Sequence, residues 1–155
     1  MQQEKNHQEV FDMGKVAVVY WSGTGNTEEM AKAVLEGAKK GGAEAELFTV
    51  SDFGADKMAD YNGFLFGCPA MGDEVLEEDE FEPFFTEAEK KLSGVPVGLF
   101  GSYGWGSGAW MEAWAERTKA AGAKLVSDGV IVENAPDDDG VKACEELGEA
   151  VAKAL

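Results

Sequence analysis

The residues best suited to chemistry in this chain form one short loop, SGTGNT, at residues 22–27. The loop follows an apolar run and precedes a segment with helical spacing. Gly23 and Gly25 can therefore adopt positive φ and let backbone N–H groups converge on an anion at a helix N-terminus. Side chains add neutral donors, and the loop contains no Lys or Arg. We predict a phosphate-binding loop, with side-chain donors from Ser22, Thr24, Asn26 and Thr27.

Spacing argues against two common phosphate-binding loops. A P-loop requires a Lys that reaches the β- and γ-phosphates, and none is placed for that role. The dinucleotide fingerprint requires a third glycine where this chain has Glu28. A purely structural strand-to-helix turn is the alternative. The density of hydroxyl groups favours a ligand with a single phosphate.

A second candidate loop, GCPAMGDE at residues 67–74, follows another apolar run. It places the flexible Met71 and Gly72 beside the acidic pair Asp73 and Glu74. Ordinary packing is the alternative for Met71. The EEDE run that follows, residues 77–80, is expected to form a solvated face.

A third candidate loop, SYGWGSG at residues 102–108, sets Tyr103 and Trp105 among closely spaced glycines. Glycine is costly in folding entropy, so this spacing suggests that the backbone approaches a flat ligand closely. Burial of Trp105 in the core is the alternative.

The segments that must position these loops alternate between short apolar runs and longer runs with helical spacing, which is typical of βαβ units around a parallel sheet. Apolar stripes beginning at Met30, Phe81, Trp110 and Val141 predict four helices, whose stripes indicate core packing. The last stripe is extended to Leu155, and a short helix is expected over residues 56–61. Five strands are predicted, at residues 16–21, 46–50, 63–68, 95–100 and 130–132.

Length and composition indicate one domain, expected to span residues 14–155 after a disordered extension at residues 1–13. Lys plus Arg is 13 against 30 for Asp plus Glu, giving a net charge of -17. This charge argues against nucleic-acid and anionic membrane partners and favours partners with basic patches. No apolar run approaches the roughly 18 residues of a membrane span. Cys68 and Cys144 suggest neither a disulfide framework nor a zinc site, so a cytoplasmic setting is expected.

The motifs YWSGTGNTE (residues 20–28), GCPAMGDE (67–74) and LFGSYGWGSG (99–108) together resemble the short-chain flavodoxins of anaerobic bacteria such as clostridia. The match runs from about residue 14 to the C-terminus, and three motifs in this order are specific. The resemblance implies a flavodoxin-like, doubly wound α/β fold. Its five-stranded parallel sheet would have the order 2-1-3-4-5, with helices on both faces.

The resemblance also implies FMN as a non-covalent cofactor. The 22–27 loop would bind the phosphate, and Ser102 and Asn134 would approach the phosphate or the ribityl chain. The isoalloxazine ring would lie between Met71 and Trp105, with Glu74 accepting from ring N3. Pro69 departs from members that carry Ser there, so a phosphate contact from that position is absent. The predicted cofactor-binding residues are Ser22, Gly23, Thr24, Gly25, Asn26, Thr27, Pro69, Ala70, Met71, Gly72, Asp73, Glu74, Ser102, Tyr103, Gly104, Trp105, Gly106 and Asn134.

By resemblance, the protein is a low-potential one-electron carrier without substrate turnover of its own. It would shuttle between semiquinone and hydroquinone, with a flip of the Gly72–Asp73 peptide on reduction. We expect a monomer that meets redox partner proteins with basic patches. One alternative is an FMN-dependent quinone or nitro reductase, which needs space over the ring where Trp105 is expected. Another is a flavin-free signalling domain, which needs an acidic cluster where the first strand ends in Tyr20-Trp21-Ser22.

Overall fold

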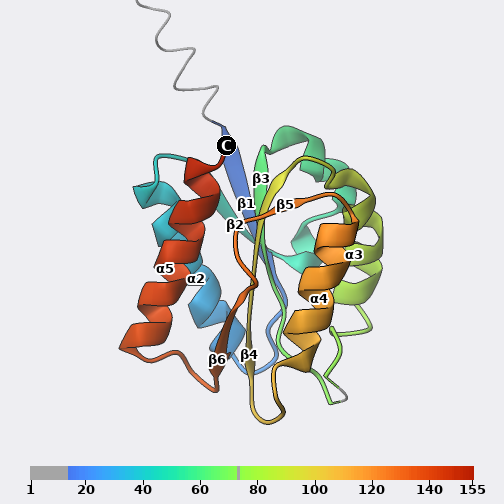
Figure 1. The fold of residues 1–155 in the computed structure, drawn as a ribbon, viewed down its shortest axis with the longest axis vertical. Helices are drawn as coiled ribbons and strands as arrows, with labels where there is room; N and C mark the ends of the chain where they lie inside the picture. Colours follow the sequence, from blue (N-terminus) through green and yellow to red (C-terminus); the bar gives the residue numbers. More distant parts are fainter. Residues whose placement is uncertain (1–13, 73) are drawn as a thin grey trace, which may run out of the picture.

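A computed structural model describes residues 14–72 and 74–155, and the expected extension at residues 1–13 lies outside this part of the chain. Within the described residues, six strands form one parallel sheet in the order β2-β1-β3-β4-β5, and β6 also pairs with β4 (Figure 1). This order confirms the predicted fold class. The strands are β1 (Lys15–Tyr20), β2 (Glu44–Thr49), β3 (Gly63–Gly67), β4 (Pro96–Tyr103), β5 (Lys124–Leu125) and β6 (Val130–Glu133).

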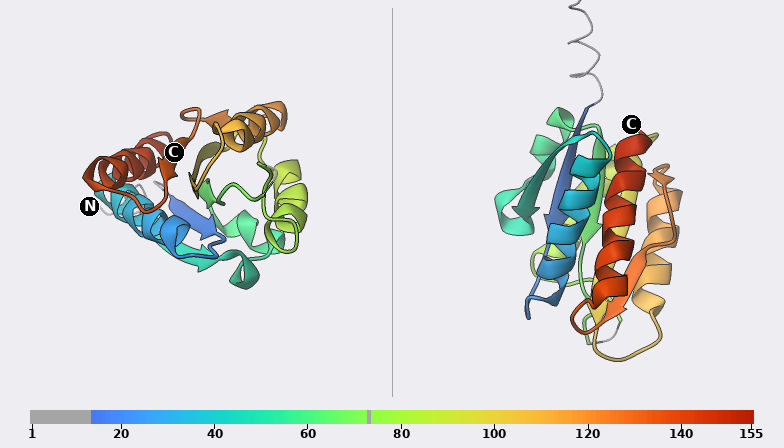
Figure 2. Two further views of the ribbon diagram at one scale, coloured as in Figure 1. Left: turned by 90° about the horizontal axis from the view of Figure 1, so that it is seen from below. Right: turned by 90° about the vertical axis from the view of Figure 1, so that its left-hand side faces the viewer.

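Helices cover both faces of the sheet, as Figures 1 and 2 show. One face carries α2 (Asn26–Lys40) and α5 (Asp138–Lys153), and the other carries α3 (Phe81–Ala88) and α4 (Ala109–Ala120). Short 3₁₀ segments complete the connections: η1 (Val50–Asp52), η2 (Ala55–Asp60) and η3 (Glu89–Lys91). The short helix predicted over residues 56–61 is η2. No helix in the described part of the chain is both long and apolar enough to span a membrane.

Side chains of the central strands alternate between the two faces, because successive residues of a strand point to opposite sides. In β1, Val16 and Val18 belong to the core beneath α2 and α5, whereas Ala17 and Val19 belong to the core beneath α3 and α4. Every residue of β3 is buried. The nearly continuous apolar runs seen in the sequence are therefore strands covered on both sides.

The fifth position in the sheet differs from the prediction of one strand at residues 130–132. It is filled by two segments, β5 beside the start of β4 and β6 beside its end. A turn separates them, in which the Gly129 N–H donates to Ser127 Oγ at 3.3 Å and Gly129 has a φ of 109°. Such a φ is readily adopted by glycine, and Gly129 directly precedes β6.

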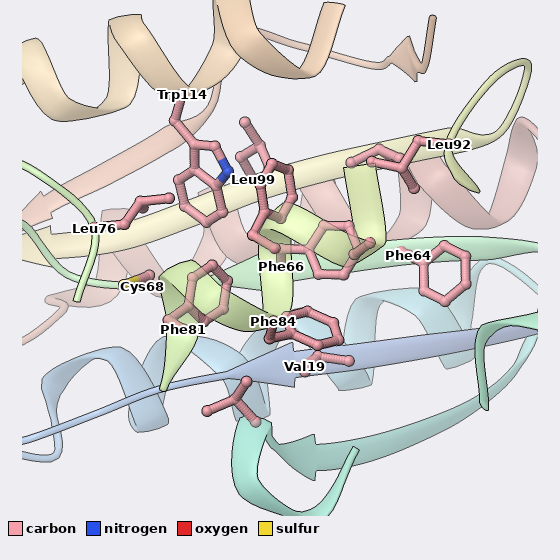
Figure 3. Close-up of a cluster of buried hydrophobic side chains, with 14 of the residues drawn as sticks. Val19, Phe64, Phe66, Cys68, Leu76, Phe81, Phe84, Leu92, Leu99 and Trp114 are labelled. Atoms are coloured by element: carbon pink, nitrogen blue, oxygen red, sulfur yellow. The ribbon is translucent and has the colours of Figure 1, made fainter. Parts of the chain in front are cut away.

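The core between the sheet and the α3–α4 layer is rich in aromatic rings, shown in Figure 3. Phe81 and Phe85 of α3 meet the Trp114 ring of α4 edge-on, with centroid distances of 5.4 and 5.7 Å. The stripes predicted for both helices are thus core contacts. Leu155, placed in the last predicted stripe, lies beyond the end of α5 and is 38% exposed.

Glycine residues allow the backbones of α2 and α5 to approach each other closely. A Cβ on Gly37 of α2 would overlap the carbonyl oxygen of Glu145, and a Cβ on Gly148 of α5 would overlap that of Val34. The two helix backbones therefore touch directly. This contact holds α2 against α5, and α2 carries the loop that precedes it.

Candidate cofactor site

The carboxyl ends of β1 and β3 lie at the same level of the sheet, beside β4, which continues to Tyr103. Tyr20 of β1 pairs with Gly67 of β3, which in turn pairs with Phe100 of β4. Parallel α/β sheets bind ligands at this edge, where the order of the strands reverses. The three candidate loops all begin here.

Backbone hydrogen bonds continue past the strand ends and bring the loops together. The Ala70 N–H donates to the Ser102 carbonyl oxygen at 3.0 Å, which joins the loop after β3 to the end of β4. The Asn134 N–H donates to the Tyr103 carbonyl oxygen at 2.8 Å, which brings in the residue after β6. Residues far apart in sequence therefore form one site.

A pocket of ≈ 250 Å³ lies where these loops meet. Every residue that lines it except Trp21 belongs to the predicted cofactor-binding set. The lining residues are Trp21, Ser22, Gly23, Thr24, Asn26, Thr27, Pro69, Ala70, Met71, Ser102, Tyr103, Gly104 and Asn134.

The 22–27 loop is shaped by its own hydrogen bonds. Gly25 is the N-cap of α2 and has a left-handed φ of 98°. Ser22 Oγ accepts the N–H of Gly25 at 3.1 Å and that of Glu28 at 3.3 Å. These two bonds occupy the acceptor capacity of the Ser22 hydroxyl, so its proton is left to donate to another group.

The same loop leaves backbone donors without an acceptor. Among the hydrogen bonds formed within residues 14–72 and 74–155, none uses the N–H groups of Gly23, Thr24, Asn26 or Thr27. They precede or open α2, where the helix macrodipole favours negative charge. The donor set is neutral and suits a phosphate group.

Thr27 and Ser102 form a buried joint beneath the loop. Thr27 is 1% exposed and Ser102 is 5% exposed. Their hydroxyl groups lie 3.1 Å apart, and Thr27 Oγ1 also accepts the Ser102 N–H at 3.3 Å. The joint ties the start of α2 to β4, so the Thr27 hydroxyl already has partners within the protein.

Trp21 lines the pocket but was not among the predicted site residues. A Cβ on Gly23 would lie 3.0 Å from the Trp21 ring, so the ring supports the backbone of the loop. Its Nε1 donates to Glu80 Oε1 at 3.0 Å. The sequence contains one signal for it, an aromatic residue directly before the loop, but the apolar run predicts that this residue belongs to the strand.

The outer predicted residues lie beside this pocket rather than in its lining. They are Gly25, Gly72, Glu74, Trp105 and Gly106, while Asp73 lies outside the described residues. Trp105 is 67% exposed, so it is not a core residue. The Glu74 N–H donates to the Met71 carbonyl oxygen at 2.7 Å, which forms a tight turn around Gly72.

Glu74 connects the two outer loops. Its φ is 56°, which is unusual for a residue other than glycine. The carboxylate accepts the N–H groups of Gly108 at 3.1 Å, Ala109 at 2.9 Å and Ser107 at 3.4 Å, at the start of α4. The two predicted ring-binding loops are therefore neighbours. The role of Glu74 at ring N3 stays a prediction.

The cysteines take no part in disulfides. Cys68, at the end of β3, and Cys144 are both buried and free. Burial raises the pKa of each thiol to about 12, so both remain protonated at neutral pH. Within the described residues, no group of three or more His, Cys, Asp and Glu side chains is placed to hold a metal ion.

Comparisons with known proteins identify the family. The family model of flavodoxin matches residues 18–148. The flavodoxin of Megasphaera elsdenii is 50% identical over 142 residues, which cover 90% of this chain and 99% of that protein. The chain belongs to the flavodoxin family. The flavodoxin of Clostridium beijerinckii is 47% identical over 135 residues, covering 87% of this flavodoxin and 97% of its relative.

A solved structure agrees with this assignment. The solution structure of two-electron reduced Megasphaera elsdenii flavodoxin matches with a TM-score of 0.81 at 51% identity, covering 89% of this flavodoxin and 98% of that chain. Flavodoxins are small FMN-binding electron carriers, so FMN is the cofactor and electron transfer to redox partner proteins is the function. The predicted family, cofactor and functional class are confirmed, and neither a reductase nor a flavin-free signalling domain is favoured.

Proposed function

We propose that this flavodoxin is a low-potential one-electron carrier whose pocket at the 22–27 loop holds the phosphate and ribityl chain of FMN. The observation that carries the proposal is the set of backbone N–H groups in this loop that have no acceptor within the described residues. FMN supplies the redox chemistry when bound. The protein residues bind it, orient it and set its potential.

The phosphate contacts come from the loop. The N–H groups of Gly23, Thr24, Asn26 and Thr27 donate to phosphate oxygens, and the Ser22 hydroxyl adds its free proton. A Cβ on Gly25 would meet no protein atom within 4 Å, so it is the left-handed φ of 98° that favours glycine there, not crowding. Pro69 has neither an N–H nor a hydroxyl group, so it contributes surface only.

Both sides of the pocket contribute to the remaining contacts. Ser102 and Asn134 approach the phosphate or the ribityl chain from β4 and from the residue after β6. The ring would pack between Met71 and the exposed Trp105. Its edges would meet the remaining predicted residues, which are Ala70, Gly72, Asp73, Glu74, Tyr103, Gly104 and Gly106.

The charge of the site supports a low potential. The loop has no Lys or Arg to offset a phosphate dianion, and the net charge of the protein is -17. A unit negative charge about 10 Å from the ring disfavours an added electron by roughly 1 to 2 kcal/mol at an effective dielectric near 20. About 1.4 kcal/mol corresponds to about 59 mV for a one-electron couple.

The distribution of charge along the helices supports partners with basic patches. α2 has Glu28 and Glu29 in its first turn and Lys39 and Lys40 in its last. α5 likewise has acidic residues in its first turn and Lys153 in its last. The helices of a parallel sheet begin at the edge where the strands end, so this sorting makes the pocket edge the acidic end of the molecule. A basic partner would be steered toward the pocket.

The remaining proposals follow from the same charge and from the resemblance. We propose a cytoplasmic monomer that has neither nucleic-acid nor membrane partners. Sedimentation velocity at two concentrations tests the monomer. Binding assays with DNA and with anionic vesicles test the other two statements, and we expect neither to retain the protein.

An anaerobic redox titration followed by absorbance tests the proposed function. We expect two resolved one-electron steps, with the second at low potential. A single two-electron step would contradict the carrier role. Oxidation of NAD(P)H without an added reductase would instead support an FMN-dependent reductase.

A further inference from the structure

Glu77 is a buried carboxylate in the connection between β3 and α3. It is 5% exposed, although it begins the acidic EEDE run that we expected to be solvated as a whole. Its carboxylate accepts three backbone N–H groups, those of Asp79, Glu80 and Phe81, each at 2.8 Å. No ion pair to Glu77 forms within the described residues. Hydrogen bonds from backbone donors at the start of α3 therefore offset the unfavourable desolvation of this buried charge.

The main chain of Glu77 is held as firmly as its side chain. Its N–H donates to Cys68 Sγ at 3.4 Å, and its carbonyl oxygen accepts the Glu82 N–H at 2.8 Å. Cys68 is fixed in turn, because its own N–H donates to the Phe100 carbonyl oxygen of β4 at 3.1 Å. Glu77 thus joins the end of β3 to the first turn of α3.

This anchor closes the loop that carries the predicted ring contacts. The loop follows β3, and its Ala70 N–H donates to the Ser102 carbonyl oxygen of β4. The Glu74 carboxylate then holds the loop to the start of α4, and the loop ends at Glu77. Between these two points, Gly72 is exposed, and a Cβ there would meet no atom within 4 Å. Glu77, Met71 and Gly72 line the same surface pocket. Gly72 is therefore not crowded by its neighbours, whereas the loop around it is held at Ala70, Glu74 and Glu77.

We propose that Glu77 is a positioning residue for FMN, because its buried carboxylate fixes the end of the loop that holds Met71 and Gly72 against the ring. The proposal rests on the proposed placement of the ring beside this loop. It differs from a simple helix cap, which would stabilise α3 without changing the cofactor. A fixed loop end would orient the backbone groups at Met71 and Gly72. In the proposed site these groups contact the ring, and their contacts change with its redox state.

Glu77→Gln tests the proposal, with Glu78→Gln as the matched control. A Gln side chain can still accept two of the three N–H groups, but its NH₂ group would face the Asp79 N–H. Glu78 is the next residue, is exposed, and makes no side-chain hydrogen bond or ion pair within the described residues. Both variants lose one negative charge, so their difference isolates the anchor.

Two quantities decide the outcome for the purified holoprotein. One is the FMN dissociation constant from quenching of flavin fluorescence, and the other is the separation between the two one-electron potentials. We expect Glu77→Gln to raise the dissociation constant about tenfold. We also expect it to narrow the separation by about 59 mV, which is a tenfold change for a one-electron couple. Glu78→Gln should change the dissociation constant less than about twofold.

Equal values for the two variants would overturn the proposal, even if Glu77→Gln lowered the unfolding free energy of the apoprotein. In that case Glu77 only caps α3. If Glu77→Gln fails to fold by far-UV circular dichroism, Glu77→Asp decides, because it keeps the charge and shortens the anchor. An unchanged separation in Glu77→Asp would also refute the proposal. Failure of the proposed function looks different, because the wild type itself would then show no two resolved one-electron steps.

Discussion

Replacing Thr27 by Val tests whether the 22–27 loop is held in place by β4 as well as by its ligand. The substitution keeps the shape of a side chain that is 1% exposed, but it removes the acceptor of the Ser102 N–H and the partner of the Ser102 hydroxyl. A buried polar group left without a partner costs about 1–3 kcal/mol. The two bonds are long, at 3.3 and 3.1 Å. We therefore expect the free energy of unfolding of the apoprotein to fall by about 1–2 kcal/mol.

Thr24→Val, in the same loop, should change FMN affinity rather than the stability of the apoprotein. Thr24 is exposed, and its side chain makes no hydrogen bond within the described residues, so the unfolding free energy should change by less than about 0.5 kcal/mol. If its hydroxyl donates to the phosphate, FMN affinity should fall about tenfold to a hundredfold, because a hydrogen bond to a charged group contributes about 1.5–3 kcal/mol. Urea unfolding of the apoprotein and FMN titration separate the two effects. If the Thr27→Val apoprotein were as stable as the wild-type apoprotein, the hydrogen bonds between Thr27 and Ser102 would not stabilise the loop, and the reasoning would be refuted.

Three other perturbations probe packing, pH and charge. Gly148→Ala should gain about 1 kcal/mol of helix propensity but lose more, because overpacking against α2 costs about 1–3 kcal/mol or more; a raised urea midpoint would contradict the close contact. Burial alone would raise the pKa of Glu77, but its three backbone hydrogen bonds lower it on balance, so its stabilisation is complete above about pH 4.3 and is lost as the pH falls further. Unfolding titrations from pH 6 to pH 3 should therefore be flatter for Glu77→Gln than for wild type. Asp139→Lys should slow reduction of a basic c-type cytochrome at low salt more than Glu44→Lys, and equal rates in stopped flow would refute steering to the pocket edge.

Most of the fold could be predicted because local signals agreed with the tertiary structure. The run ending at Tyr20 is apolar throughout since β1 is buried on both faces, and its strand was placed within one residue at each end. The 22–27 loop was recognisable because glycine and hydroxyl residues have a shared physical reason to cluster before a helix. Pro83 is compatible with the helix predicted from Phe81, because it lies in the first turn of α3, where its missing N–H has no helical acceptor.

The missed features depend on contacts between distant residues. β5 has only two residues, too few for any periodicity, and it forms because β4 offers a partner. Trp21 was assigned to a strand because nothing local indicates that its ring turns under Gly23. The four carboxylates at residues 77–80 look alike in sequence. Only the folded conformation of the connection shows that the Glu77 carboxylate accepts the first amide of α3.

The helix N-termini at the pocket edge give a reason to place the proposed phosphate site at α2. At α3 the first amides are bound by Glu77, at α4 by Glu74, and at α5 by Asp137, which accepts the Gly140 N–H at 2.8 Å. The chain thus supplies a carboxylate to each of these helices. At α2 the N-cap is Gly25, which has no side chain, and the Ser22 hydroxyl is neutral. An anion at a helix N-terminus is stabilising by about 0.3–1 kcal/mol or more. In the proposed site, the FMN phosphate would therefore take at α2 the place that a carboxylate fills at the other three helices.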